Sequence, residues 1–417
     1  MKTTRRDISL HTRLSRRRLL GTVARAGAGI GGMLLAKTPP AFPSQHTLTV
    51  LTWSHFIPAS DEHLLHMAQT FGTERRCEVN IDFIPHRDTY IKVAKEQQTR
   101  KGHDIVFLFF SMPQLHHEDL ETLDFMEALG HKLGGWYDLA RAVGQVQGRW
   151  VALPWFCTAM PMTYREDLYR QHGFSPPQTW EAWQETARKI KEASGHKAGV
   201  ALNQTEDSNL TLYAILWSYG ASTVDAAGRV MINSSETRRA MDYVKELYAS
   251  CMTDEVLSWD DASNNQAFLS GQYSWVHNAT SVYGVAKRIA PKIFEGTNHT
   301  LTPSGPGGQH GTAIPNNYGI WRFATEKTLA KEFLQYMMDI ERLEANFYAT
   351  ATFNAPLFKA GEKFDWQRDP KTAMLKDYMQ TAHMIGWPAP PDHRAEQARA
   401  QWVVPNMFTA YATGKQS

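Results

Sequence analysis

The sequence predicts an α/β protein of two domains, and two observations carry this prediction. The first part of the chain beyond residue 46 alternates strand and helix patterns, with strands expected at 47–53, 78–83 and 104–109 and helices at 61–71 and 90–99. Such alternation is typical of a mainly parallel sheet with helices on both faces. At 417 residues the chain also exceeds what one hydrophobic core usually serves, so a second domain is expected.

Each of these elements follows from its side-chain pattern. The segment 78–83 alternates apolar and polar residues, as a half-buried strand does, whereas 104–109 is a continuous apolar run expected of a strand buried on both faces. The helix at 61–71 gathers its apolar residues on one side. These are Leu64, Leu65, Ala68 and Phe71. Ligands of such sheets bind beyond the carboxyl ends of the strands, which directs attention to 53–55 and 109–111.

The first 41 residues form a separate segment that does not belong to the fold. An arginine-rich stretch, Ser15 to Leu20, precedes a mildly apolar run from Gly21 to Ala36 and a small-residue cleavage site after Ala41. This order resembles a twin-arginine export signal, and the run is too short and too weakly apolar for a membrane span. A soluble periplasmic protein is therefore expected.

The net charge of +2 belongs to this leading segment, because its nine basic residues face a single acidic one. The remaining chain carries 35 basic and 41 acidic residues, so no nucleic-acid partner is expected. The three cysteines are widely spaced with no C-x-x-C pair, which favours buried thiols.

The stretch 150–183 is the most informative part of the chain. We expect a buried strand at 151–153 that Pro154 ends, because proline gives no N–H to a sheet. A short helical segment then begins at Tyr164. Thr179 can cap a helix whose buried face includes Trp180 and Trp183, and Gly195 stops that helix. Both tryptophans are therefore assigned to the core.

This stretch resembles the interdomain crossover of the family 1 extracellular solute-binding proteins, the group that contains maltose-binding protein. Arg165 and Glu166 depart from it, where relatives usually carry Asn and Lys. Four later segments resemble the same family in the same order: the helix–strand unit 267–278, the glycine-rich loop 303–308, the helix 327–334 and the late helix 398–414.

The resemblance implies a two-lobed periplasmic-binding-protein fold (type II) with a hinge between discontinuous lobes. It implies that the chain changes lobe near 154–158, 300–305 and 338–344. The amino-terminal lobe would comprise 46–155 plus 303–340, and the carboxyl-terminal lobe 156–302 plus 341–417. A binding component of a sugar-type ABC importer is implied, acting as a monomer that captures a small carbohydrate or polyol by hinge closure and delivers it to an inner-membrane permease.

A sugar site needs aromatic platforms for C–H faces and polar groups for hydroxyls in a dry cleft. Candidates are residues at predicted strand ends and hinges. The candidate platforms are Trp53, Phe110, Trp155, Trp217, Tyr283 and Trp402. The candidate hydrogen-bonding residues are Ser54, His55, Ser111, Gln114, Thr158, Asn278, Asn316 and Asn317. The resemblance places Trp155 and Trp402 at the cleft. Where maltose-binding relatives often follow the 273–278 strand with glycine and an aromatic, this chain has Ala279 and Thr280, so a small ligand is favoured unless Tyr283 substitutes.

No motif makes a positive case for catalysis. H-E-x-x-H, G-x-S-x-G and P-loop patterns are absent from the sequence, and no cofactor or metal is expected. The pair His116 and His117 is better interpreted as the start of a solvated helix than as metal ligands, because no further ligand recurs at suitable spacing. Two alternatives stay open. One is a binding protein for another polar solute, such as a polyamine or an amino sugar, and a cationic ligand of this kind would need Asp or Glu beside the aromatics. The other is an exported enzyme.

Overall fold

The computed structural model describes residues 46–415, so the expected export signal lies outside the described residues. The first sheet has the strand order β14-β13-β3-β1-β2, and β6 also pairs with β13. Its strands are β1 (Thr47–Trp53), β2 (Glu78–Ile84), β3 (Ile105–Phe109), β6 (Leu153–Ala159), β13 (Gly311–Ile320) and β14 (Ala382–His383). Strand β1 runs parallel to both β2 and β3, which confirms the expected parallel α/β arrangement.

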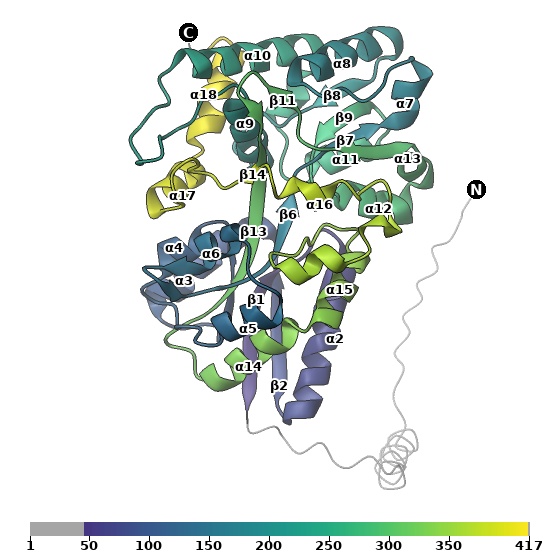
Figure 1. Ribbon diagram of the computed structural model, residues 1–417. Coiled ribbons are helices and arrows are strands. Elements are labelled where there is room, and N and C mark those ends of the chain that lie inside the picture. Colours follow the sequence, from purple (N-terminus) through teal and green to yellow (C-terminus); the bar gives the residue numbers. More distant parts are fainter. Residues whose placement is uncertain (1–45, 416–417) are drawn as a thin grey trace, which may run out of the picture. The chain divides into compact units, whose positions relative to one another are not determined.

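Helices cover both faces of this sheet (Figure 1). In that view α3, α4 and α6 lie to its left, and α2 and α15 lie side by side to its right. The helices of this part are α2 (Pro58–Arg75), α3 (Thr89–Thr99), α4 (Met112–His116), α5 (Met126–Lys132), α6 (Asp138–Gly144), α14 (Lys327–Met337), α15 (Ile340–Ala349) and α16 (Leu375–Tyr378). The predicted helices at 61–71 and 90–99 correspond to α2 and α3.

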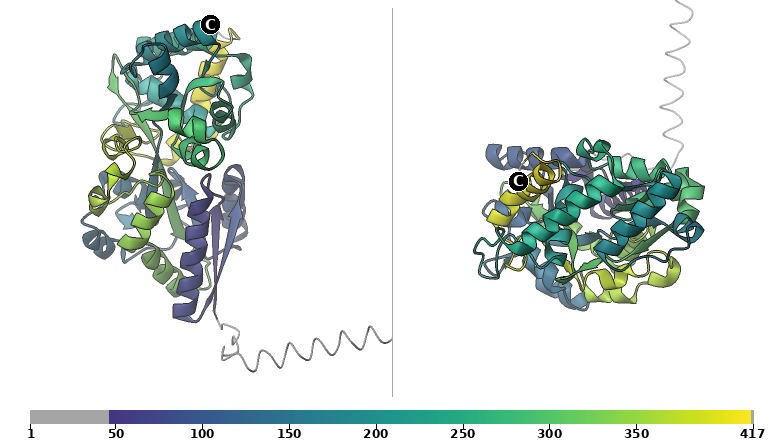
Figure 2. Two further views of the ribbon diagram at one scale, coloured as in Figure 1. Left: turned by 90° about the vertical axis from the view of Figure 1, so that its right-hand side faces the viewer. Right: turned by 90° about the horizontal axis from the view of Figure 1, so that it is seen from above.

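The second sheet is smaller and has the order β10-β7-β9-β8. Its strands are β7 (Met162–Arg165), β8 (Lys197–Gly199), β9 (Tyr273–His277) and β10 (Thr297–Thr300). Helices surround it, as the side and top views show (Figure 2). They are α7 (Glu166–Gln171), α8 (Trp180–Ser194), α9 (Glu206–Ser218), α10 (Ser235–Cys251), α11 (Ser263–Leu269), α12 (Ser281–Ile289), α13 (Pro291–Gly296), α17 (His393–Ala400) and α18 (Val403–Ala412).

Helix α8 shows how local sequence sets an element. The Thr179 hydroxyl accepts a hydrogen bond from the Ala182 N–H, and Gly195 ends the helix at φ 78°, in the left-handed region. Trp180 and Trp183 are fully buried, which confirms their assignment to the core. The cap, the buried face and the stop were all predicted from the sequence.

Two predictions about the crossover were wrong in detail. Pro154 does not end a strand but lies inside β6, opposite Asn317 of β13. The register shifts between Asn316 and Asn317, and this bulge leaves Trp155 without an opposing residue, so the ladder tolerates a residue that lacks an N–H. Tyr164 belongs to β7, and the short helix that follows begins only at Glu166.

The chain passes between the two sheets at three places. It leaves the first sheet after Ala159 and enters the second at Met162, and it returns between Thr300 and Gly311. Strands β6 and β13 pair antiparallel there and form a two-stranded connection, along which β13 runs the length of the first sheet (Figure 1). We propose this connection as the hinge, close to the expected 154–158 and 300–305.

The third crossing differs from the expectation of 338–344. Side chains from Leu343 to Tyr378 pack in the hydrophobic cluster of the first sheet, and the cluster of the second sheet resumes only at Ile385. The apolar faces of α15 and the following loops cover α2 and the first core instead of the second. We therefore propose lobe bounds that assign 341–378 to the amino-terminal lobe and leave 385–415 in the carboxyl-terminal one.

The predicted late helix 398–414 is two helices, α17 and α18. Trp402 breaks them apart because it adopts the left-handed conformation at φ 58°. The three cysteines are buried free thiols, as predicted. Within residues 46–415, no helix is both long and apolar enough to cross a membrane.

Candidate functional site

A cavity of about 40 Å³ lies where the strand ends of the first sheet meet the second lobe. Aromatic side chains of the first lobe, polar groups of the hinge and two carboxyls of the second lobe line it together. Its lining residues are Trp53, Phe56, His86, Phe109, Thr158, Met160, Asp207, Asp261, Asn278, Ala279, Ser281, Ile314, Asn316 and Phe353. We call it the interlobe cavity.

The first-lobe wall is a cluster of aromatic rings around Trp53. This residue ends β1, is 3% exposed, and lies 5.2 Å from Phe56 and 5.5 Å from Phe109 between ring centroids. His86 stacks on Phe56 at 5.9 Å. Burial, together with the nearby positive charge of Arg399, lowers the pKa of His86 to about 4, so this ring is neutral at pH 7. The wall is therefore apolar and uncharged.

The hinge contributes amide and hydroxyl groups. Asn316 on β13 donates from Nδ2 to the Ile314 carbonyl oxygen at 2.8 Å and to Thr158 Oγ1 at 3.3 Å. Asn278, just beyond β9, donates from its backbone N–H to the Pro161 carbonyl oxygen at 3.2 Å, and its side-chain amide contacts Asn265. These contacts fix polar side chains at the floor of the cavity, where hydroxyls of a ligand could bind.

The second-lobe wall carries two carboxyls, Asp207 in the first turn of α9 and Asp261 in the loop before α11. The Asp207 N–H donates to Asp261 Oδ1 at 3.2 Å, and the Asp207 carboxyl accepts from the Asn264 amide. Burial, together with the negative charge of Glu206, raises the pKa of Asp261 to about 7. Burial and the charge of Asp261 raise the pKa of Asp207 well above its ordinary range.

A buried ion cluster stands behind this wall and spans the two lobes. The Arg399 guanidinium donates to the carboxylates of Glu206 and Glu396, and all three side chains are at most 8% exposed. Its Cζ atom lies 4.8 Å from the Tyr90 ring centroid and 4.6 Å from that of Phe110, both in the first lobe. We call Arg399, Glu206 and Glu396 the Arg399 cluster; it links the lobes in this conformation.

The structure brings together some of the residues predicted for the site. Trp53, Thr158, Asn278 and Asn316 line the interlobe cavity. Phe110 and Ser111 lie beside it against the Arg399 cluster: the Ser111 N–H donates to Glu396 Oε2 at 3.3 Å, and Phe110 packs under the guanidinium. The predicted strand ends 53–55 and 109–111 thus do reach the cavity.

The other predicted residues do not line the cavity. Trp155 packs on Phe156 and Tyr318 in the core, and Trp217 packs on Trp387 in the second lobe. Tyr283 donates to Asp369 at 2.9 Å, and Trp402 begins α18. Three of the polar candidates make hydrogen bonds to backbone groups or to a neighbouring side-chain amide, and a fourth is exposed to solvent. Asn317 and Gln114 donate to carbonyl oxygens, His55 contacts Ile57 and Asn354, and Ser54 is exposed.

The cavity residues that were not predicted come from both lobes, and they include Phe109 of the first and Asp207 and Asp261 of the second. Phe109 had a clear signal, because it ends the apolar run 104–109, yet only its neighbour Phe110 was named as a platform. Asp207 follows the capping residue Thr205, and Asp261 lies in the acidic pair 260–261. Acidic residues at such positions are common on surfaces, so the pattern gave no reason to single them out.

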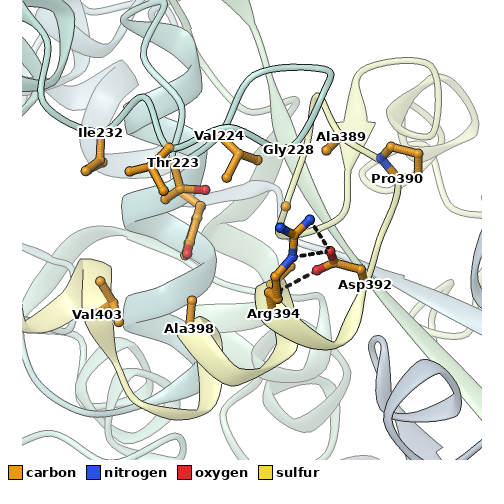
Figure 3. A pocket seen from close by; sticks show the side chains of 14 residues that line it. Thr223, Val224, Gly228, Ile232, Ala389, Pro390, Asp392, Arg394, Ala398 and Val403 are labelled. Atoms are coloured by element: carbon orange, nitrogen blue, oxygen red, sulfur yellow. Dashed lines mark hydrogen bonds and ion pairs between the residues drawn. The ribbon is translucent and has the colours of Figure 1, made fainter.

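A second and larger cavity, of about 250 Å³, lies within the second lobe between the loop 223–232 and the segment 386–403 (Figure 3). Its lining is mainly apolar, with Val224, Ile232 and Val403 among it. The two charged residues that line it, Arg394 and Asp392, pair with each other, because Arg394 Nε donates to Asp392 Oδ2 at 2.8 Å. A polar solute would find few partners there, so the interlobe cavity is the better candidate site.

Metal chemistry finds no support in residues 46–415, where no cluster of three or more His, Cys, Asp or Glu side chains is placed to hold an ion. His116, one of the pair considered as metal ligands, is 4% exposed and contacts Gln97 through Nδ1 at 2.7 Å. It is therefore buried within the first lobe and does not begin a solvated helix, as the sequence had suggested.

This fold and site define a two-lobed binding protein, and sequence comparison agrees. The pattern of the bacterial extracellular solute-binding protein family matches residues 66–374, so the chain belongs to this family. It is 25% identical over 187 residues to a probable ABC transporter-binding protein of Deinococcus radiodurans, covering 43% of this chain and 44% of that protein. It is 25% identical over 140 residues to a putative ABC transporter periplasmic-binding protein of Escherichia coli, covering 32% of each. The matches thus span less than half the length of these relatives.

Solved structures show the same fold over nearly the whole length. The maltose-bound T. maritima MalE3 superposes with a TM-score of 0.78 at 22% identity, covering 89% of this chain and 95% of that one. A solute-binding protein of Agrobacterium radiobacter in complex with ribitol gives 0.73 at 17% identity, covering 90% and 96%. A sugar transporter protein of Arthrobacter chlorophenolicus with bound laminaribiose gives 0.77 at 15%, covering 89% and 95%. These likenesses confirm the predicted two-lobed fold.

Proposed function

We propose that this protein is the substrate-binding component of an ABC importer, a monomer that captures a small carbohydrate or polyol and delivers it to a membrane permease. The observation that carries the proposal is the interlobe cavity, in which aromatic rings face amide, hydroxyl and carboxyl groups. Rings contact the C–H faces of a sugar and the polar groups satisfy its hydroxyls. The maltose, ribitol and laminaribiose bound by structural neighbours support this substrate class.

We propose hinge closure as the mechanism. A cavity of about 40 Å³ holds only a few molecules the size of water, so a sugar must bind when the lobes are further apart. In the present conformation a Cβ atom added at Gly284 of the second lobe would lie 3.0 Å from Ile57 Cδ1 of the first. A ligand that contacts both walls favours the closed form by the difference between its affinities for the two forms. Micromolar affinity, about −8 kcal/mol, would allow both capture and release.

Phe56 is the residue whose removal tests the site most cleanly. It is only half-buried, yet it lines the cavity and contacts Trp53, so its truncation removes a platform with little loss of core. We expect Phe56→Ala to weaken binding of the best sugar or polyol about tenfold, as measured by isothermal titration calorimetry.

The matched control for this experiment is Phe323→Ala. Phe323 is also half-buried and stacks on Trp321, but it does not line the cavity. If wild type and Phe56→Ala bound the ligand with equal affinity, the interlobe cavity would not be the binding site. Bound ligand raises the melting temperature, so mono- and disaccharides and polyols can be screened by this shift. If none of these compounds raised the melting temperature, the proposed function would be overturned.

We propose that the chain is exported by the twin-arginine route and acts in the periplasm. The support is the order of an arginine-rich stretch, an apolar run and a small-residue site within the first 41 residues. Changing Arg16 and Arg17 together to Lys is expected to abolish export, which fractionation of expressing cells would show. Undiminished periplasmic yield of that variant would contradict the route, while leaving the binding function untouched.

A further inference from the structure

The interlobe cavity is lined by acidic side chains but by no basic side chain that is charged at pH 7. Asp207 and Asp261 line it, and none of its fourteen lining residues is a lysine or an arginine. His86 adds no positive charge at pH 7, because its pKa is about 4. The guanidinium of Arg399, behind the second-lobe wall, is already shared between Glu206 and Glu396. The two carboxyls therefore face the cavity with no cation of the described chain to pair with them.

A third hydrogen-bond acceptor at the cavity, beside the two carboxyls, lacks a donor. The Asn316 side chain is 1% exposed, and its Nδ2 is fixed by the Ile314 carbonyl oxygen, which can only accept a hydrogen bond. Its Oδ1 atom is thereby an acceptor, and this buried atom has no hydrogen-bond partner among residues 46–415. An unpaired buried acceptor costs free energy. A donor that enters the cavity would remove that cost.

The opposite wall also favours a cation. Trp53, Phe56, Phe109 and Phe353 line the cavity together with the two carboxyls. The face of an aromatic ring carries partial negative charge, so a protonated amine near these rings is attracted to them as well as to the carboxylates. A neutral hydroxyl would gain much less from either wall.

We propose that the ligand is a sugar or polyol that bears a protonated amino group, and that its ammonium binds between Asp207 and Asp261. An ammonium has three donors and no acceptor, which suits two carboxyls and the Asn316 carbonyl oxygen. This inference rests on the proposed function and narrows its substrate class. The hydroxyls of the same ligand would contact the hinge groups Thr158 and Asn278.

Such a ligand makes binding depend on pH. Bound ammonium favours the ionised carboxyls, and the pKa of Asp261 in the ligand-free protein is about 7, so affinity rises from pH 6 upward as that proton is lost and falls again once the amine of the ligand loses its own proton. Other charged or titratable groups lie in this region. They are Glu206, Asp207, Asp260, His86, Arg87 and Arg399. A neutral sugar would show a weaker dependence.

The test compares each neutral sugar with its amino counterpart. Calorimetric titration of the purified protein with glucose and glucosamine, and with galactose and galactosamine, measures the preference directly, with N-acetylglucosamine as a neutral amide control. Putrescine and spermidine distinguish an alkyl polyamine from an amino sugar. We expect an amino sugar to bind about 10- to 100-fold more tightly than its neutral partner.

Three variants assign this preference to the site. Asp261→Asn and Asp207→Asn keep the side-chain shape and each remove a carboxyl that can ionise against the bound ammonium, so both are expected to abolish most of the preference. Asp260→Asn is the matched control, because it also replaces a carboxyl by an amide, while Asp260 is exposed, does not line the cavity and accepts hydrogen bonds from Ala262 and Ser263. Melting temperatures of all three report whether each variant is folded.

The outcomes separate this inference from the function on which it rests. Neutral sugars that bind as tightly as their amino counterparts, in wild type and in Asp261→Asn, would overturn the inference and leave the proposed function standing. Binding of polyamines alone would support an ammonium site and overturn the carbohydrate function. Binding of no compound in any series would overturn both.

Discussion

Replacing Arg399 by alanine is expected to lower the free energy of unfolding by about 3–5 kcal/mol, because it leaves two buried carboxylates without their cation. The Arg399 side chain is 1% exposed, and its partners Glu206 and Glu396 are 8% and 3% exposed. The variant also loses the packing of the guanidinium on Tyr90 and Phe110 across the lobes. Urea unfolding followed by circular dichroism measures the effect.

Two further variants sharpen this result. Arg399→Lys keeps the charge, but a single ammonium cannot reproduce the fork that joins both glutamates, so an intermediate loss is expected. Arg170→Ala is the surface control: Arg170 pairs with Glu166 at 3.3 Å but is 76% exposed, and such pairs contribute about 0–1 kcal/mol. If Arg399→Ala and Arg170→Ala unfolded at the same urea concentration, the Arg399 cluster would not stabilise the protein.

The protein is also expected to lose stability steeply as the pH falls below about 6.5. Burial lowers the pKa of His55 and His299 to about 4 and that of His277 to about 3. Because the unfolded chain binds a proton at each of these residues near pH 6.5 and the folded chain does not, their stabilisation is present above that pH and disappears between 6.5 and 4. A shift of this size corresponds to about 3 kcal/mol for one buried histidine.

Three carboxyls act in the opposite direction and offset part of this loss. Burial raises the pKa of Asp61 to about 6, that of Asp261 to about 7 and that of Asp207 well above its ordinary range, so all three bind a proton in the folded state before they do so when unfolded. The histidines whose pKa is lowered by burial also include His86, His116 and His383, so they outnumber these carboxyls, and the net effect is acid destabilisation.

Urea midpoints measured from pH 8 to pH 4.5 test the pH prediction. His277→Gln removes one titrating group and keeps a partner for the Thr211 hydroxyl, which lies 2.8 Å from His277 Nδ1. The variant is expected to show a shallower dependence on pH. Midpoints that stay constant down to pH 4.5 would contradict the proposed role of these histidines.

The sequence alone determined the elements whose signals are local. The alternation and apolar runs near 47–53 and 104–109 correspond to β1 and β3, and the cap and stop of α8 are the residues Thr179 and Gly195. The order of motifs along the chain was enough to predict the two-lobed fold. It also directed attention to the strand end at Trp53, which lines the interlobe cavity.

Only the tertiary structure decided which side chains meet at the cavity. Trp53 and Trp155 look alike in the sequence, but the bulge opposite β13 leaves Trp155 in the core while Trp53 lies at the end of its strand. Asp207 and Asp261 come from different elements and meet through the packing of α9 against the loop before α11. A local pattern tells which residues are apolar or charged, but not which face a distant strand or the other lobe will cover. For that reason the fold could be predicted from the sequence, whereas the pairing of Asp207 with Asp261 and the Arg399 cluster could not.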